Sequence, residues 1–220
     1  VVMLAGQPDV AKKLLERVIE INPLDVSTRF QLGCLAVEQS DFKVAFEQLE
    51  RCTTLAPEFA DGWAHLSALQ AQLGDKPAAA RTLATGLLKC PQSPGLHLMR
   101  ARNLREAGQR EEAINDFMIS SRLRPNEPDA FIELGSTYLE LGRIAEGMEQ
   151  IRLALEAEPG NPAALGILAY YAITTGDEAA ARNWLDQVVL QPRVPREQML
   201  QLTDAFSRQF GHAWSPSPKK

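Results

Sequence analysis

The sequence predicts an all-α fold, a right-handed α-solenoid of stacked antiparallel helical hairpins. The main observation is a ladder of five prolines spaced 34 residues apart: Pro23, Pro57, Pro91, Pro125 and Pro159. A fixed period in this range is typical of repeated supersecondary units that stack on one another. Other columns of similar residues recur in the phase of this ladder and support the same unit.

Three columns carry the residue types that a helical hairpin requires. With each ladder proline at position 32, position 15 holds Gly6, Ser40, Gly74, Gly108, Gly142 and Gly176. Position 20 is always small, and position 24 is always large and apolar. Glycine suits the left-handed residue that ends a helix, and proline stops the second helix of the unit. A small residue at position 20 lets two helices cross closely, since a larger one would overpack the crossing.

The ladder also divides the chain into units. A partial first repeat covers residues 1–25, and five full repeats cover 26–59, 60–93, 94–127, 128–161 and 162–195. Within each repeat the pattern predicts a first helix, helix A, over about positions 1–14. A second helix, helix B, is predicted over about positions 16–30. Position 16 is often Asp, as at Asp41, Asp75 and Asp177, which can cap helix B.

The C-terminal end departs from the period, because its last proline, Pro192, comes one residue early. Residues 196–210 then place Met199, Leu202, Phe206 and Phe210 on one side of a further helix. A stack of this kind needs a terminal helix to cover its last apolar face, so we predict a capping helix at 196–210. Residues 211–220 are predicted to form a polar, flexible tail.

The N-terminal end has no corresponding cap in the sequence. The apolar face of its first helix, which includes Val10, Leu14 and Val18, would lack part of its cover. We therefore expect self-association or fraying at this end. We also read the chain as a piece of a longer protein.

Composition limits the classes of function. The net charge of −5 argues against nucleic acid as a partner, and no apolar run approaches a membrane span. Motifs for a nucleophile, a phosphate loop or a zinc protease are missing, so we expect no enzyme activity and no cofactor. His65, His97 and His212 are too scattered for a metal site. The sparse cysteines favour a cytoplasmic over a periplasmic location.

In these columns the chain resembles the tetratricopeptide repeat family. The family pattern has an aromatic residue at position 4, Leu-Gly at 7–8, Tyr at 11, Ala at 20, an apolar residue at 24, a small residue at 27 and Pro at 32. Repeat 128–161 matches it with Phe131, Leu134, Gly135, Tyr138, Gly147, Ile151, Ala154 and Pro159. The resemblance extends over residues 1–195. It implies a binding scaffold whose partner, a protein or peptide with apolar anchors, lies in a concave groove formed by the helices A.

The resemblance also implies which side chains line that groove. They come chiefly from positions 2, 5, 6, 9, 12 and 13 of each helix A. The candidates are Phe30, Cys34, Val37, His65, Leu98, Met99, Arg102, Arg105, Ile132, Glu133, Leu139, Ile167, Tyr170 and Ile173. Some of these residues could instead pack against neighbouring helices.

Two specialised groups of the family are excluded at the same positions. The carboxylate clamp of co-chaperones needs Lys at position 5, where this chain has Phe30, Ala64 and Leu98. The Asn ladder at position 6 of sugar-transferring members is also missing. A mixed, partly apolar groove remains.

Two features of the groove leave alternatives open. Arg100, Arg102 and Arg105 cluster on one helix, where they could anchor a partner carboxylate. They could equally form internal pairs, Arg102 with Glu133 and Arg100 with Asp116. Cys34 could be a reactive thiol, whereas Cys52, at the packed position 27, is expected to be buried.

Two functions fit the sequence. The first is a non-catalytic scaffold that binds a protein or peptide. The second is the recognition arm of a larger enzyme or of a secretion or assembly component, whose other domains would lie upstream of residue 1.

Overall fold

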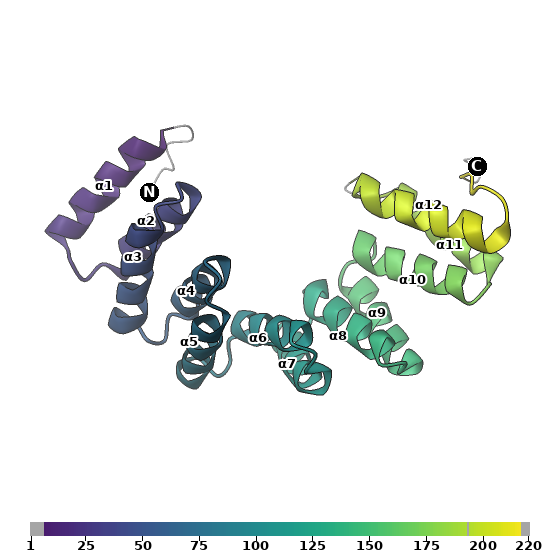
Figure 1. Cartoon of the computed structure of the whole chain (residues 1–220), viewed down its shortest axis with the longest axis horizontal. Coiled ribbons are helices and arrows are strands. Elements are labelled where there is room, and N and C mark those ends of the chain that lie inside the picture. Colours follow the sequence, from purple (N-terminus) through teal and green to yellow (C-terminus); the bar gives the residue numbers. More distant parts are fainter. Residues whose placement is uncertain (1–6, 193, 217–220) are drawn as a thin grey trace. The chain divides into compact units, whose positions relative to one another are not determined.

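The computed structural model describes residues 7–192 and 194–216, and in this part of the chain every regular element is a helix. The helices follow the repeat, one helix A and one helix B in turn (Figure 1). They are α1 (Pro8–Ile21), α2 (Val26–Glu38), α3 (Phe42–Leu55), α4 (Ala60–Gln72), α5 (Lys76–Lys89), α6 (Pro94–Glu106), α7 (Arg110–Leu123), α8 (Pro128–Glu140), α9 (Ile144–Ala157), α10 (Pro162–Thr174), α11 (Glu178–Val189) and α12 (Arg196–Phe210).

The chain divides into two compact units, Val1–Ala107 and Gly108–Lys220. The first contains α1 to α6 and the second α7 to α12. The two helices of repeat 94–127 therefore belong to different units.

Within each unit, every helix contacts the next helix in the chain. Alternate helices also touch: α2 contacts α4 and α4 contacts α6, while α8 contacts α10 and α10 contacts α12. These second contacts join successive helices A, and α12 takes part in them as a helix A would. The all-α stack of hairpins is thus confirmed in each unit.

Local sequence sets where each helix begins and ends. The carboxylates of Asp75 and Asp177 accept hydrogen bonds from the backbone N–H groups of Ala78 and Ala180, at 2.9 and 3.0 Å, as helix caps should. The helices A end at a residue with positive φ, and this residue is glycine except at Ser40, where φ is 60°. Position 15 is therefore a left-handed turn in every described repeat.

The helices of a hairpin cross closely where the sequence is small. A Cβ atom on Gly135 would lie 2.7 Å from Ile151 Cδ1 and 3.0 Å from the backbone oxygen of Gly147. A Cβ on Gly147 would lie 2.7 Å from Leu139 Cγ. Real Cβ atoms essentially never approach other atoms to 2.7 Å, so a larger residue at Gly135 or Gly147 would force Ile151 or Leu139 to shift.

The core follows the column of large residues at position 24. Leu49, Leu83, Phe117, Ile151 and Leu185 are all fully buried. Cys52 is also fully buried, as expected of its packed position. No helix in the described part of the chain is long and apolar enough to cross a membrane.

The C-terminal helix α12 has the bounds that the sequence predicts for a capping helix. Its Leu202 and Phe206 are buried in one core cluster with Leu185 of α11 and Ala169 of α10. Beyond it, Trp214 packs against this same cluster. The predicted tail thus contains one side chain that packs on the core, and residues 217–220 of it lie outside the described part of the chain.

Candidate partner-binding site

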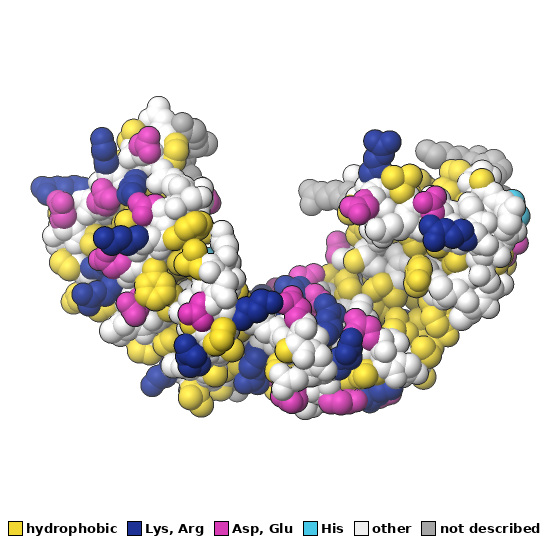
Figure 2. Space-filling view, viewed as in Figure 1, with side chains coloured by type: hydrophobic (Ala, Val, Ile, Leu, Met, Phe, Trp, Pro, Cys, Tyr) yellow, Lys and Arg dark blue, Asp and Glu magenta, His cyan; other side chains and the backbone are white. Residues whose placement is uncertain are grey.

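An open groove lies on the second unit, bordered by α8, α10 and α12. Its volume is about 660 Å³. Figure 2 shows hydrophobic side chains gathered over this part of the unit. The lining residues are Ser136, Leu139, Glu140, Ile144, Ala163, Gly166, Ile167, Tyr170, Tyr171, Thr174, Gln198, Gln201 and Leu202.

The floor of the groove is α10, which contains no charged residue. The Tyr170 side chain is 56% exposed although it is large and aromatic, and Ile167 is half-buried beside it. Exposed apolar surface of this kind on a folded protein marks an interaction site more often than a neutral surface. The floor therefore offers anchors for apolar side chains.

One wall comes from α12. The Gln198 side chain reaches the first turn of α10 and donates a hydrogen bond to the backbone oxygen of Pro162, at 3.0 Å. A Cβ on Gly166 would lie only 2.2 Å from Gln198 Nε2, so the glycine leaves room for the amide. Gln201 lines the same wall. Both amides can pair with the backbone of a bound peptide.

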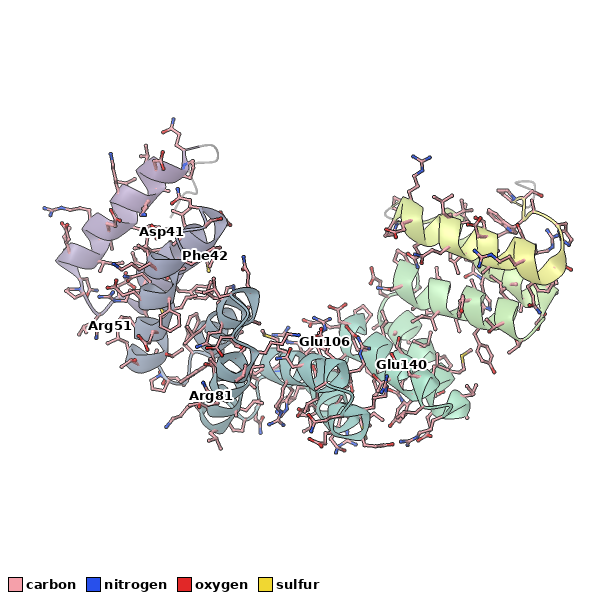
Figure 3. The ribbon with its side chains drawn as sticks, in the orientation of Figure 1. Asp41, Phe42, Arg51, Arg81, Glu106 and Glu140 are labelled. Carbon is pink, nitrogen blue, oxygen red and sulfur yellow. The ribbon has the colours of Figure 1, made fainter. Side chains whose placement is uncertain are left out.

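The lining of the groove carries little charge. Glu140, at the end of α8 (Figure 3), is the one charged residue in the lining. Its carboxylate accepts a hydrogen bond from Arg110 Nε at 2.8 Å. The rest of the lining is apolar, hydroxyl or amide, which favours an uncharged ligand segment.

The groove residues predicted in the second unit lie in three different environments. Leu139, Ile167 and Tyr170 lie together in the lining of the groove. Ile132 and Glu133 are half-buried on α8 outside this lining. Ile173 is only 2% exposed, because it belongs to the core cluster that contains Leu202 and Phe206 of α12. Its assignment to the groove was wrong, since the capping helix covers it.

The predicted residues of the first unit lie on α2, α4 and α6. Phe30 makes edge-to-face contacts with the rings of Phe59 and His65, with centroids 5.1 and 4.7 Å apart. Phe30 and Val37 also pack against the core of this unit, and Met99 packs against a second core cluster. Leu98 is half-buried and His65 is exposed. For the apolar members, packing against neighbouring helices accounts for much of their surface.

The thiol of Cys34 is a poor candidate for reactivity. Burial raises its pKa, and the carboxylates of Glu38 and Asp61 raise it further. Burial likewise raises the pKa of the Cys52 thiol to about 11. A reactive cysteine needs a lowered pKa, so both sites favour the protonated, unreactive form.

Arg100, Arg102 and Arg105 lie half-buried on α6. Pairing of Arg102 with Glu133 and of Arg100 with Asp116 stays a prediction. Among residues 7–192 and 194–216, no three side chains of the metal-binding types gather into a site.

A recurring hydrogen bond at position 4 was not foreseen from the sequence. Trp63 Nε1 donates to the backbone oxygen of Pro57 at 2.8 Å, and the His97 ring nitrogen Nε2 bonds to that of Pro91 at 3.0 Å. Arg29 donates to the oxygen of Pro23 with two nitrogens, at 2.9 and 2.7 Å. Each N–H binds the carbonyl of the preceding ladder proline. These residues differ in shape and share only an N–H donor near the end of the side chain. That shared donor is the sequence feature from which the bond could have been predicted.

Solved structures share this fold at low sequence identity. One reported in "Functional Characterization of Pseudomonas Aeruginosa pilF" is 19% identical, with a TM-score of 0.72, and the match covers 84% of each chain. PilW, a type IV pilus biogenesis factor, is 17% identical with the same TM-score over 84% of this chain and 86% of that one. YrrB, described as a TPR protein with an unusual peptide-binding site, is 19% identical with a TM-score of 0.56, over 73% of this chain and 83% of that one.

Sequence comparison finds a relative and a matching family model. The tetratricopeptide repeat-containing protein trd-1 of Caenorhabditis elegans is 34% identical over 77 residues, which are 35% of this chain and 10% of that protein. The chain thus spans a small part of this relative. A family model described as tetratricopeptide repeat matches residues 30–95 and 98–162, more than half of the chain. The chain therefore belongs to the tetratricopeptide repeat family.

Proposed function

We propose that this protein is a non-catalytic scaffold that binds a protein or peptide partner on the faces of its helices A. Proteins of this family are generally protein–protein interaction modules. The observation that carries the proposal is the groove of α8, α10 and α12, with Tyr170 exposed on its floor. Aromatic side chains that are both exposed and set in a concave surface are frequent anchors of binding energy.

The lining specifies the chemistry of the partner segment. Leu139, Ile167 and Tyr170 offer apolar contacts, and Gln198 and Gln201 offer amides. A segment with Leu, Ile or Phe anchors and no charge at its centre would bury apolar area on α10. Its backbone would pair with the amides of α12. A charged centre would lose hydration without gaining an opposite charge, since Glu140 is already paired with Arg110.

The experiment uses an array of short peptides that carry Leu, Ile and Phe anchors, and then the affinity of the best binder in solution. Tyr170→Ala should weaken binding about tenfold or more, since truncation of an interface aromatic commonly costs about 2 kcal/mol. Ala163→Glu should weaken it as well, because it adds an unpaired charge to the exposed lining.

Leu88→Ala is the matched control, because Leu88 is 82% exposed on α5, in the other unit. It should leave the affinity unchanged. Binding that is equal in the Tyr170 and Leu88 variants would count against the groove. A complete lack of peptide binders would count against the scaffold proposal itself.

A second candidate function is the recognition arm of a larger protein. It is favoured by the match to trd-1, of which the chain spans only a tenth. The type IV pilus factor among the structural neighbours is similar in fold alone. Sequencing of the full gene product distinguishes the candidates, since an adjoining catalytic or assembly domain is expected only for the second.

A further inference from the structure

The amide of Gln198 fills the space that a side chain at position 5 of repeat 162–195 would occupy. Every other full repeat carries a larger residue at this groove position: Phe30, Ala64, Leu98 or Ile132. Repeat 162–195 has Gly166, and a Cβ there would lie only 2.2 Å from Gln198 Nε2. This part of the groove therefore presents an amide where the other repeats have an apolar side chain.

The Gln198 amide is held in one orientation. Its Nε2 donates to the backbone oxygen of Pro162 at 3.0 Å. A carbonyl oxygen can only accept, so the nitrogen of the amide must face Pro162 and the oxygen must turn away from it. Gln198 Oε1 is thus a hydrogen-bond acceptor whose position is fixed by α10.

This acceptor is open to a ligand. Gln198 lines the groove, and its Oε1 accepts no hydrogen bond from the described residues. In that part of the chain Trp214 Nε1 is the one buried side-chain N or O atom without a partner, so Gln198 Oε1 is not buried. A ligand that covers the groove displaces water from this oxygen, and the oxygen then needs a donor from the ligand.

We propose that Gln198 Oε1 accepts one backbone N–H of an extended segment bound along α10, and that this bond sets the register of the segment. The inference rests on the proposed function and adds the conformation of the partner to it. Leu, Ile and Phe anchors have no side-chain N–H, so the donor must come from the backbone. In an extended segment the side chains stand perpendicular to the backbone N–H groups, so apolar anchors can face α10 while an N–H faces α12.

A helical segment fits this acceptor less well. Beyond the first four residues of a helix, the backbone N–H groups are already bonded within the helix. A helix laid along α10 would therefore cover Gln198 Oε1 without offering it a donor over most of its length. The extended conformation is the one that satisfies the acceptor.

Gln201 provides a matched comparison with the same side chain. It lies three residues further along α12 in the same lining, and it is exposed. No hydrogen bond to a described residue fixes its amide. Gln201 can turn either end towards a ligand, but it loses side-chain freedom when it does so. It therefore sets no single register.

An ester scan of the peptide tests this bond. The probe is the best-binding uncharged peptide of the array, in which each backbone N–H in turn is replaced by an ester oxygen. The ester removes one donor with little change in shape, and isothermal titration calorimetry measures each affinity. With the wild-type protein one ester position should lose about tenfold in affinity and the others at most about threefold. With Gln198→Met that position should lose no more than the others, since the acceptor is gone.

Gly166→Ala is a second variant, because its Cβ displaces the Gln198 amide and removes no polar group. It should abolish the tenfold loss as Gln198→Met does, and alanine favours the helix. Gln201→Met is the control and should keep the tenfold loss. Circular dichroism checks that all three variants keep their helix content.

The outcomes separate this inference from the proposed function. Ester losses that are spread over many positions and unchanged in Gln198→Met would indicate a bound helix and overturn the extended segment. A peptide whose binding is weakened by Tyr170→Ala, but with no position coupled to Gln198, would overturn the inference and leave the groove as the binding site. An array without any binder would overturn both.

Discussion

At the scale of single residues, the hydrogen bond at position 4 explains why this column tolerates such different side chains. Trp63, His97 and Arg29 each place an N–H on a ladder proline carbonyl. The family preference for an aromatic residue at this position reflects the shape of the site, but it does not reveal that the side chain also donates an N–H. His97, which looks like a departure in the sequence, thus provides the same contact as Trp63.

We predict that His97→Phe lowers the free energy of unfolding by about 1 kcal/mol, the usual net value of one hydrogen bond. Phenylalanine is a fair substitute in shape, since Phe131 occupies the equivalent position of repeat 128–161. Urea denaturation measures the change. The control is Gln72→Phe at an exposed position near the end of α4, which should alter stability by less than about 0.5 kcal/mol. Equal effects of the two variants would show that the bond to Pro91 contributes nothing.

Ser40 is the one non-glycine residue with positive φ in the described chain, at 60°. A side chain in this conformation crowds its own backbone, at a cost of roughly 1 kcal/mol. Ser40→Gly should therefore raise the free energy of unfolding by about 0.5–1 kcal/mol. The reverse change, Gly74→Ser at φ 87°, should lower it by a similar amount. Denaturant midpoints of both variants measure this, and a loss of stability in Ser40→Gly would contradict the assignment of strain.

At the scale of elements, the hairpins could be predicted almost in full, because their signals lie within one period of the sequence. The glycine, aspartate and proline columns mark the ends of each helix. The residues of the groove were harder to predict from the sequence, because α12 lies outside the repeat pattern. Its Gln198 and Leu202 line the groove, and its packing buries Ile173. Contacts between a repeat and a non-repeating cap leave no periodic trace in the sequence.

The Asp25 carboxylate at the start of α2 should make the stability of the fold depend on pH. The hydroxyl of Thr28 donates to the Asp25 carboxylate at 2.7 Å, and the backbone N–H groups of Ser27 and Thr28 donate to it as well. These bonds favour the ionised form, so the pKa of Asp25 is lowered from its ordinary 3.8. The stabilisation is therefore present above this ordinary pKa, and it is lost as the pH falls through the lower pKa of the folded state.

Asp25→Asn tests this dependence, since asparagine keeps a capping oxygen but does not titrate there. Unfolding free energies of the wild type and the variant should converge as the pH falls below the ordinary pKa of Asp25. Curves that stay parallel over this range would exclude Asp25 as a source of acid sensitivity.

At the scale of the whole molecule, the 34-residue period predicts the family, and the structure confirms an all-α stack within each unit. The location of the binding surface needed tertiary packing. Residues at equivalent groove positions look alike in the sequence, yet Phe30 packs against its core while Tyr170 stays exposed. Which member of a column faces a partner depends on what its neighbouring helices cover.

Binding in the groove is tested most directly by methyl and amide NMR of the full chain with an uncharged, Leu- and Phe-containing peptide taken from the array. Peptide-induced shifts should concentrate at Leu139, Ile167, Tyr170 and the side-chain amides of Gln198 and Gln201. The same titration with Tyr170→Ala should need about tenfold more peptide. Shifts that cluster on helices away from α8, α10 and α12, with these signals unmoved, would contradict the assignment of the groove as the binding site.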